Sequence, residues 1–234
     1  DHHQGGPGLS HLGKIATRSG GRMKRIEAVN DFVIKFANVN GSGSASANEL
    51  FAKAVMRMGV PVSPRNIFPS NIQGMPTWYE ARVCERGYAG RRGGVDMMVA
   101  MNPQTWNADL AEIEPGGYLF YDSTRPMPAS AFRDDITVIG MPVTAICNAT
   151  YEDPRQRTLF KNIMVIGALA ELMSVELAVI ESLFAEQYKG KLAALRQGHS
   201  QSQRTAVLLT TDTRNEIERS ALEDQYGNGN AENQ

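Results

Sequence analysis

Histidine and cysteine are scarce in this chain, and their scarcity excludes several kinds of active site. The four histidines are His2, His3, His11 and His199. No imidazole lies between residues 12 and 198, which excludes a Ser–His or Cys–His catalytic pair in that stretch. The two cysteines, Cys84 and Cys147, are far apart and have no C-x-x-C partner, so this chain alone cannot build an iron–sulfur cluster or a structural zinc site. Both are expected to pack as small core residues.

Long apolar runs and an excess of one charge are also missing. The 24 lysines and arginines nearly balance the 25 aspartates and glutamates, which gives no general reason to expect nucleic acid or an acidic membrane as a partner. No apolar run approaches the roughly 18 residues of a membrane span, and no basic segment precedes an apolar stretch at the start. We therefore expect a soluble, cytoplasmic protein.

The chain divides by composition into three parts. Residues 1–28 have no hydrophobic period and are predicted to be a flexible leader, with His2 and His3 as a disordered pair. Residues 29–190 alternate strand and helix patterns, which predicts one Rossmann-like α/β domain with a mostly parallel sheet, flanking helices and C-terminal helices. Residues 191–234 are rich in Gln, Asn, Ser and Thr and are predicted to be a polar tail, with a short helix near residues 216–225.

Hydrophobic periodicity places the elements of the central domain. An apolar strand starts near Phe32, and the helix after it keeps one buried face from Ala47 to Met58 before a stop at Gly59. A loop is predicted from Val60 to Pro76. Asp153 and Pro154 begin a later helix that is apolar nearly all round, and Ser174 is expected to cap the next one. The remaining expected strands are residues 78–84, with one solvated face, and the mostly apolar 95–101, 118–121 and 136–139; a short helix is expected at 107–113.

A turn of small residues joins the first strand to the first helix. Its residues are Gly41, Ser42, Gly43, Ser44, Ala45 and Ser46. Main-chain N–H groups and the positive end of a helix dipole would form an anion cradle there. Two other interpretations remain open, because Ser46 and Glu49 fit a capping box and small residues also allow tight packing against another subunit. No Asp or Glu follows from Phe51 through Tyr79, so the ribose acceptor of an NAD site is missing.

A second loop is basic. It contains Arg86 and, directly before a predicted strand, Arg91 and Arg92 followed by two glycines; Lys53, Arg57 and Arg65 add positive charge between the small-residue turn and Tyr79. Basic side chains and free amides that converge on one edge would suit a phosphate-bearing ligand or an acidic partner surface. The alternative, which has equal weight, is that these arginines bind no partner and are simply exposed to solvent.

Residues 66–79 form a long apolar segment interrupted by proline and glycine. Such a loop is seldom left in water, so we expect it to bury against a partner or to line a pocket; folding back on its own sheet is the alternative. Its amides, Asn66, Asn71 and Gln73, are candidate hydrogen-bonding groups for a ligand or an interface.

Four motifs, in this order, carry a resemblance to a known family. They are residues 36–48 (FANVNGSGSASAN), 68–80 (FPSNIQGMPTWYE), 91–102 (RRGGVDMMVAMN) and 162–170 (NIMVIGALA). Together they resemble the gamma module of 2-oxoacid:ferredoxin oxidoreductases, in the form found at the front of the alpha subunit of 2-oxoglutarate-type enzymes. The likeness covers roughly residues 30–190, and after about Lys189 the chain departs into its polar tail.

The resemblance implies a function that the residue patterns alone do not show. Enzymes of this family decarboxylate a 2-oxoacid oxidatively with coenzyme A, giving acyl-CoA, carbon dioxide and reduced ferredoxin. Thiamine diphosphate, magnesium and iron–sulfur clusters are then expected in partner subunits or domains, and this chain, which is not catalytic by itself, contributes to assembly and to the coenzyme A side of the site. The competing interpretations are a stand-alone nucleotide-binding sensor or scaffold and a purely structural interaction module.

The implied contacts with coenzyme A, or with the neighbouring thiamine site, are seven residues of the two loops: Gly41, Ser42, Gly43, Ser44, Ser46, Arg91 and Arg92. No residue has a strong claim to a covalent or proton-transfer role. Cys84 and Glu80 are the only reactive types near these loops, and both are more simply structural.

Overall fold

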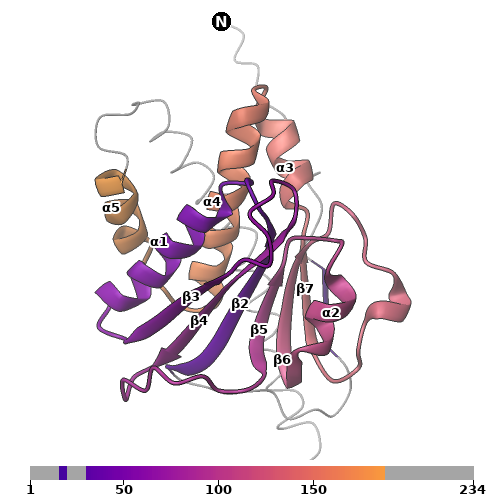
Figure 1. The fold of residues 1–234 in the computed structure, drawn as a ribbon. Coiled ribbons are helices and arrows are strands. Elements are labelled where there is room, and N and C mark those ends of the chain that lie inside the picture. The colour runs from indigo at the N-terminus through magenta and orange to yellow at the C-terminus, as the bar shows by residue number, and fades with distance from the viewer. Residues whose placement is uncertain (1–15, 20–29, 188–234) are drawn as a thin grey trace, which may run out of the picture.

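The computed structural model describes residues 16–19 and 30–187, which form one seven-stranded sheet with helices on both faces (Figure 1). The order across the sheet is β1-β7-β6-β5-β2-β4-β3. The strands are β1 (Ala16–Ser19), β2 (Asp31–Val39), β3 (Val62–Ile67), β4 (Pro76–Cys84), β5 (Val95–Ala100), β6 (Ile113–Asp122) and β7 (Thr137–Met141). The helices are α1 (Ser44–Arg57), α2 (Trp106–Ala111), α3 (Val143–Thr150), α4 (Pro154–Leu172) and α5 (Leu177–Gln187), with a 3-10 turn, η2, at Ala129–Ala131.

The centre of the sheet is parallel and its two edges are antiparallel. β2, β5, β6 and β7 run in the same direction, as neighbours in a doubly wound fold do. β4 is antiparallel to β2 and to β3, and β1 is antiparallel to β7. The predicted α/β class is confirmed, with a mixed sheet built on a parallel core.

Two hydrophobic clusters lie on opposite faces of the sheet. The larger one joins α1, α3, α4 and α5 to one face, and the smaller one joins α2 to the other. β5 is buried along its whole length, which explains its nearly continuous apolar sequence. On the larger face Phe36 of β2 forms edge-to-face contacts with Phe51 of α1 (5.8 Å between ring centroids) and Tyr79 of β4 (6.1 Å). These three rings fix α1 over the β2–β4 pair.

Several local predictions are confirmed. α1 follows the small-residue turn and ends before Gly59, whose N–H donates to the Met56 carbonyl. α4 begins at Pro154, and the Asp153 carboxylate caps it by accepting a hydrogen bond from the Arg155 N–H. Residues 163–170 of α4 are buried, in agreement with their apolar sequence. The cysteines Cys84 and Cys147 are both free and buried, and burial raises the pKa of Cys147 to about 12.

The prediction of a loop from Val60 to Pro76 is wrong for the first half of this segment, which forms the strand β3. This strand was not predicted because it contains Pro64. Proline has no N–H to donate within a sheet, so its presence argues against a central strand. β3 pairs only with β4 and is an edge strand, where proline is tolerated.

Two other features differ from expectation between α3 and α5. Ser174 does not cap a helix. It adopts a left-handed conformation (φ 55°) and donates its N–H to the Glu171 carbonyl, and α5 begins only at Leu177. The short helix α3 was not predicted, because eight residues hold too little periodicity to separate a helix from a strand.

Part of the predicted leader is a strand. Residues 16–19 form β1 at the edge beside β7, because strand pairing supplies order that hydrophobic periodicity does not reveal. The rest of the leader, the four histidines, the predicted tail and its short helix lie outside the described residues. Within the described part of the chain, no helix is both long and apolar enough to cross a membrane.

Candidate functional site

The turn between β2 and α1 lies at the carboxyl edge of the parallel strands. In open α/β sheets this is the edge that binds ligands. Gly41 (φ 84°) and Gly43 (φ 73°) both adopt left-handed conformations there. A Cβ on Gly41 would also stand 2.8 Å from Cγ of Gln73, so a side chain at this position would displace the Gln73 side chain. The backbone path of this turn therefore depends on glycine.

Hydrogen bonds from two other segments hold the turn in place. The Asn40 N–H donates to the Met75 carbonyl (2.8 Å), and the Gly74 N–H donates to the Asn40 carbonyl (3.0 Å). The Asn40 side-chain amide donates to the Ile72 carbonyl (3.2 Å). From α4, the Asn162 amide donates to the Ser42 carbonyl (2.9 Å). The turn is thus fastened to residues 72–75 and to α4 before any ligand arrives.

The first turn of α1 has no side-chain cap. Gly43 occupies the N-cap position, and no side chain accepts a hydrogen bond from the helix start. The predicted capping box of Ser46 and Glu49 is wrong, because Ser46 lies inside the helix; Glu49 instead pairs with Lys53 (2.8 Å). The first N–H groups of a helix have no partners within the helix, and together with the dipole they attract anions.

A cavity of about 250 Å³ opens beside this turn. Residues from β2, the turn, α1, β3 and β4 line it: Asn38, Val39, Asn40, Gly41, Gly43, Ser44, Ala45, Asn48, Asn66, Phe68, Thr77, Trp78 and Tyr79. No lysine, arginine, aspartate or glutamate is among these residues. The cavity therefore offers hydrogen-bonding groups and aromatic surface, and the negative charge of a ligand would be met only by main-chain amides.

Three polar side chains of the cavity lining belong to buried residues: those of Asn38, Asn48 and Tyr79, which are only 6%, 5% and 4% exposed. The Tyr79 hydroxyl is buried and has no hydrogen-bond partner within the described residues. Burial raises the pKa of Tyr79 to about 12, so its hydroxyl stays protonated and can donate. The sequence analysis did not single out these groups. Asn48 could have been found from the sequence, because its helical spacing from Phe51 and Val55 places a polar side chain on the buried side of α1.

The basic loop is not part of this site. Arg91 and Arg92 precede β5, which runs parallel to β2, so they lie at the opposite end of the strands from the Gly41 turn. The expected convergence of the two loops on one edge therefore does not occur. Arg92 forms an ion pair with Asp96, and Nε of Arg91 lies 3.6 Å from the Glu80 carboxylate, which Arg65 also approaches (3.5 Å).

The other basic side chains of that prediction lie apart from the cavity lining as well. Arg57 forms a bidentate ion pair with Glu186 of α5, with N···O distances of 2.9 and 3.0 Å. Lys53 forms an ion pair with Glu49 within α1. Glu80 is held between two arginines, which agrees with its predicted structural role.

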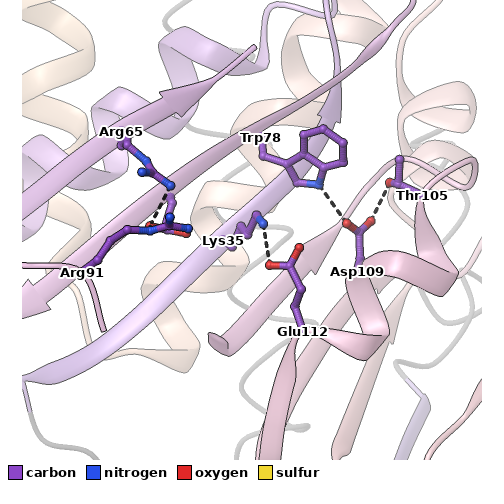
Figure 2. A network of polar contacts seen from close by, with 8 residues as sticks. Lys35, Arg65, Trp78, Arg91, Thr105, Asp109 and Glu112 are labelled. Atoms are coloured by element: carbon purple, nitrogen blue, oxygen red, sulfur yellow. Dashed lines mark hydrogen bonds and ion pairs between the residues drawn. The ribbon is translucent and has the colours of Figure 1, made fainter. Parts of the chain in front are cut away.

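A polar network surrounds Trp78 on the opposite face of the sheet (Figure 2). Trp78 donates its indole N–H to the carboxylate of Asp109 (2.8 Å), which also accepts a hydrogen bond from Thr105 (2.6 Å). Lys35 lies 5.7 Å from the centre of the Trp78 ring and pairs with Glu112 (2.5 Å). Asp109 is fully buried, and burial raises its pKa. This network joins β2, β4 and α2.

The apolar segment at residues 66–79 lines the cavity only in part. Asn66 and Phe68 contribute to its wall, and the aliphatic part of Gln73 packs against Gly41. Three large apolar side chains of the same segment remain exposed to solvent: Phe68 (50%), Ile72 (67%) and Met75 (44%). Among the described residues, no group of three or more histidine, cysteine, aspartate or glutamate side chains could hold a metal ion.

Comparisons with known proteins agree with this architecture. The family model described as pyruvate ferredoxin/flavodoxin oxidoreductase matches residues 33–200. None of the curated proteins is a significant match to the sequence.

Three similar solved structures share the fold. The 2-oxoglutarate:ferredoxin oxidoreductase from Magnetococcus marinus, with 2-oxoglutarate, coenzyme A and succinyl-CoA bound, has a TM-score of 0.71 and 19% identity over 79% of this chain. A pyruvate oxidoreductase subunit from Thermotoga maritima (TM-score 0.61, 16% identity) aligns over 76% of this chain and 96% of its own. The gamma subunit of a keto/oxoacid ferredoxin oxidoreductase from Geobacter sulfurreducens (0.59, 16%) aligns over 77% and 99%. The match spans only 32% of the Magnetococcus chain.

Proposed function

The chain belongs to the pyruvate ferredoxin/flavodoxin oxidoreductase family, and from this membership we propose that it is a subunit or domain of a thiamine-diphosphate-dependent 2-oxoacid:ferredoxin oxidoreductase. The whole enzyme converts a 2-oxoacid and coenzyme A into acyl-CoA and carbon dioxide, and two electrons pass to ferredoxin. Thiamine diphosphate, magnesium and the iron–sulfur clusters belong to partner modules. This chain contributes to assembly and to the coenzyme A side of the active site, in the cytoplasm.

The observation that carries this proposal is the uncapped start of α1 on a rigid glycine turn beside a cavity. The phosphates of coenzyme A are anions, and an uncapped helix start binds anions through its N–H groups. The Magnetococcus enzyme, which has the same fold in part of its chain, was solved with coenzyme A. We assign the phosphate contact to residues 41–46, that is Gly41, Ser42, Gly43, Ser44 and Ser46 with Ala45 between them. Arg91 and Arg92 are left out, because they pair with Glu80 and Asp96 at the other edge of the sheet.

Ala45→Asp is the substitution that tests this contact in the reconstituted complex. Ala45 is exposed in the first turn of α1 and lines the cavity, so a carboxylate there occupies the amides and repels a phosphate. The KM for coenzyme A is expected to rise about tenfold, which corresponds to about 1.4 kcal/mol. The fold should be kept, because an acidic residue in the first turn stabilises a helix by about 0.3–1 kcal/mol.

Ala45→Asn is the matched control, since it adds similar bulk without charge, and its KM for coenzyme A should stay near that of the parent. The double variant Arg91→Ala with Arg92→Ala should also leave this KM unchanged. A normal KM in Ala45→Asp would remove the turn from the coenzyme A site. If ATP, and not coenzyme A, stabilised the isolated chain by the roughly 2.7 kcal/mol expected at 100 times the dissociation constant, the stand-alone nucleotide-binding function would be favoured.

The exposed apolar segment supports a role in assembly. Phe68, Ile72 and Met75 face solvent although hydrogen bonds to Asn40 hold residues 72–75 in a fixed conformation. Residues 66–79 contain no charged side chain, and the centres of protein interfaces are similarly depleted of charge. We attribute this surface to contact with the partner module that carries thiamine diphosphate.

Replacing Ile72 by aspartate tests that contact. A charge in the middle of an apolar interface is left without a partner, so copurification with the other subunits is expected to fall at least about tenfold. Tyr88→Asp is the control, because Tyr88 is equally exposed (66%) in a different loop. Circular dichroism of both variants should match the parent. An intact complex with Ile72→Asp would place the interface elsewhere.

A further inference from the structure

One side chain of α4 holds the peptide group at the centre of the glycine turn. Asn162 donates its side-chain amide to the Ser42 carbonyl (2.9 Å), although the two residues are 120 positions apart in the sequence. The Ser42 carbonyl and the Gly43 N–H belong to the same planar trans peptide group, so they point in opposite directions. A partner that fixes the Ser42 carbonyl therefore also fixes the direction of the Gly43 N–H.

Gly43 borders two different spaces. Gly43 and Asn162 both line a small hollow between α1, α4 and α5. Gly43 also lines the cavity of about 250 Å³, together with Ser44 and Ala45, and no residue of α4 contributes to that lining. Because the Ser42 carbonyl points toward α4, the Gly43 N–H points away from α4 and from the hollow.

The position of Asn162 is fixed by its neighbours in α4. It follows Lys161, whose Nζ lies 3.3 Å from the Asp122 carboxylate at the end of β6. It precedes residues 163–170, which are buried in the larger hydrophobic cluster. α4 therefore holds the Asn162 backbone in one place relative to the sheet and the glycine turn.

The conformational freedom of glycine makes this external hydrogen bond necessary. Gly43 has φ 73°, and glycine adopts left-handed and right-handed conformations about equally readily. Without a partner for the Ser42 carbonyl, the peptide group between residues 42 and 43 can rotate. The hydrogen bonds from residues 72–75 reach Asn40 and do not act on this peptide group. Helix stability does not explain Asn162, since asparagine is a poorer helix former than leucine.

We infer that Asn162 is a positioning residue for anion binding at the turn: it holds the Ser42 carbonyl so that the Gly43 N–H points into the cavity and toward a phosphate group. The inference rests on the proposed function for the identity of that phosphate, which belongs to coenzyme A. Asn162 does not line the cavity, so it acts through the main chain and not by touching the ligand.

Asn162→Leu in the reconstituted complex tests this role. Leucine has a similar branched shape but no donor, so the Gly43 N–H loses its fixed direction. Hydrogen bonds weaken steeply as the N–H turns away from its acceptor, and the KM for coenzyme A is expected to rise about fivefold. The kcat at saturating coenzyme A should not change, because no reacting group is removed. The urea midpoint should stay near that of the parent, since the better helix propensity of leucine offsets the lost hydrogen bond.

Two further variants separate positioning from packing. Asn162→Gln keeps an amide donor, and the hollow beside Asn162 leaves room for its longer side chain, so much of the loss in Asn162→Leu should be recovered. Thr158→Leu is the matched control one turn earlier in α4. Thr158 is exposed, and its hydroxyl donates to the Pro154 carbonyl of the same helix (3.2 Å), so this variant should keep the parent KM.

The outcomes separate this inference from the proposed function. An unchanged KM in Asn162→Leu with a raised KM in Ala45→Asp would overturn the positioning role and keep the coenzyme A contact. An equal rise in KM for Thr158→Leu, no recovery in Asn162→Gln, or a raised KM in Asn162→Leu with a normal one in Ala45→Asp would also overturn it. An unchanged KM in both Asn162→Leu and Ala45→Asp would remove the phosphate contact from the turn, and the positioning role with it.

Discussion

Replacing Phe51 by alanine is expected to lower the free energy of unfolding by about 3–5 kcal/mol. Phe51 is fully buried, and its ring contacts Phe36, which in turn contacts Tyr79. Removal of the ring takes apolar surface out of the core and leaves a cavity between α1 and the sheet, which cannot close because three elements meet there. Urea denaturation followed by circular dichroism measures the loss as a lower midpoint with an unchanged slope.

Met56 provides the matched control on the same helix. Its side chain is 51% exposed, so Met56→Ala is expected to change the free energy of unfolding by less than about 0.5 kcal/mol. A loss in Met56→Ala as large as that in Phe51→Ala would contradict core packing as the main term, because alanine is the better helix former at both positions and only Phe51 is buried.

Asp109→Ala is expected to cost about 1–3 kcal/mol, because the indole N–H of Trp78 and the hydroxyl of Thr105 both lose their acceptor. Asp109→Asn is the conservative comparison, because its amide oxygen can still accept from Trp78. Urea denaturation of the two variants near neutral pH should place Asp109→Asn clearly above Asp109→Ala.

The pH dependence of Asp109→Asn has a defined sign. Burial raises the pKa of Asp109 in the folded chain above its ordinary value of 3.8, so the folded state holds this proton more tightly than the unfolded state. The resulting stability is fully present below the unfolded pKa and is lost as the pH rises through the raised pKa. The amide of the variant does not titrate, so the stability of Asp109→Asn relative to the parent should increase as the pH rises from about 4 through the raised pKa of Asp109. A constant difference over this range would contradict a raised pKa.

The sequence predicted the parts of the fold that hydrophobic periodicity determines. The passage from strand to turn to helix at residues 31–57 was correctly predicted, because apolar spacing changes from that of a strand to that of a helix there. The buried strand β5 and the capped start of α4 were found by similar local signals. β3 was missed because Pro64 is unfavourable in most strands, and only its position at the sheet edge permits it.

The candidate site was predicted only in its local part. The Gly41 turn was predicted correctly, because a few consecutive residues determine it, and it lies between β2 and α1. The prediction that Arg91 and Arg92 converge on that turn was wrong. They precede β5, whereas the turn follows the parallel strand β2, so the two loops lie at opposite edges of the sheet. The composition of a loop does not indicate which edge it occupies. Tyr79 looked like an ordinary strand residue, since a missing hydrogen bond is a property of the packed chain.

The hydrogen bonds between Asn40 and residues 72–75 have a thermodynamic consequence. They tie the glycine turn to the segment that exposes Ile72 and Met75, so neither can shift without the other. If occupancy of the turn changes how tightly that segment binds a neighbouring protein, the neighbour must change ligand affinity at the turn by the same factor, because such coupling is reciprocal. Ligand and neighbour would then regulate one another across a short span of main chain, with no moving domain in between.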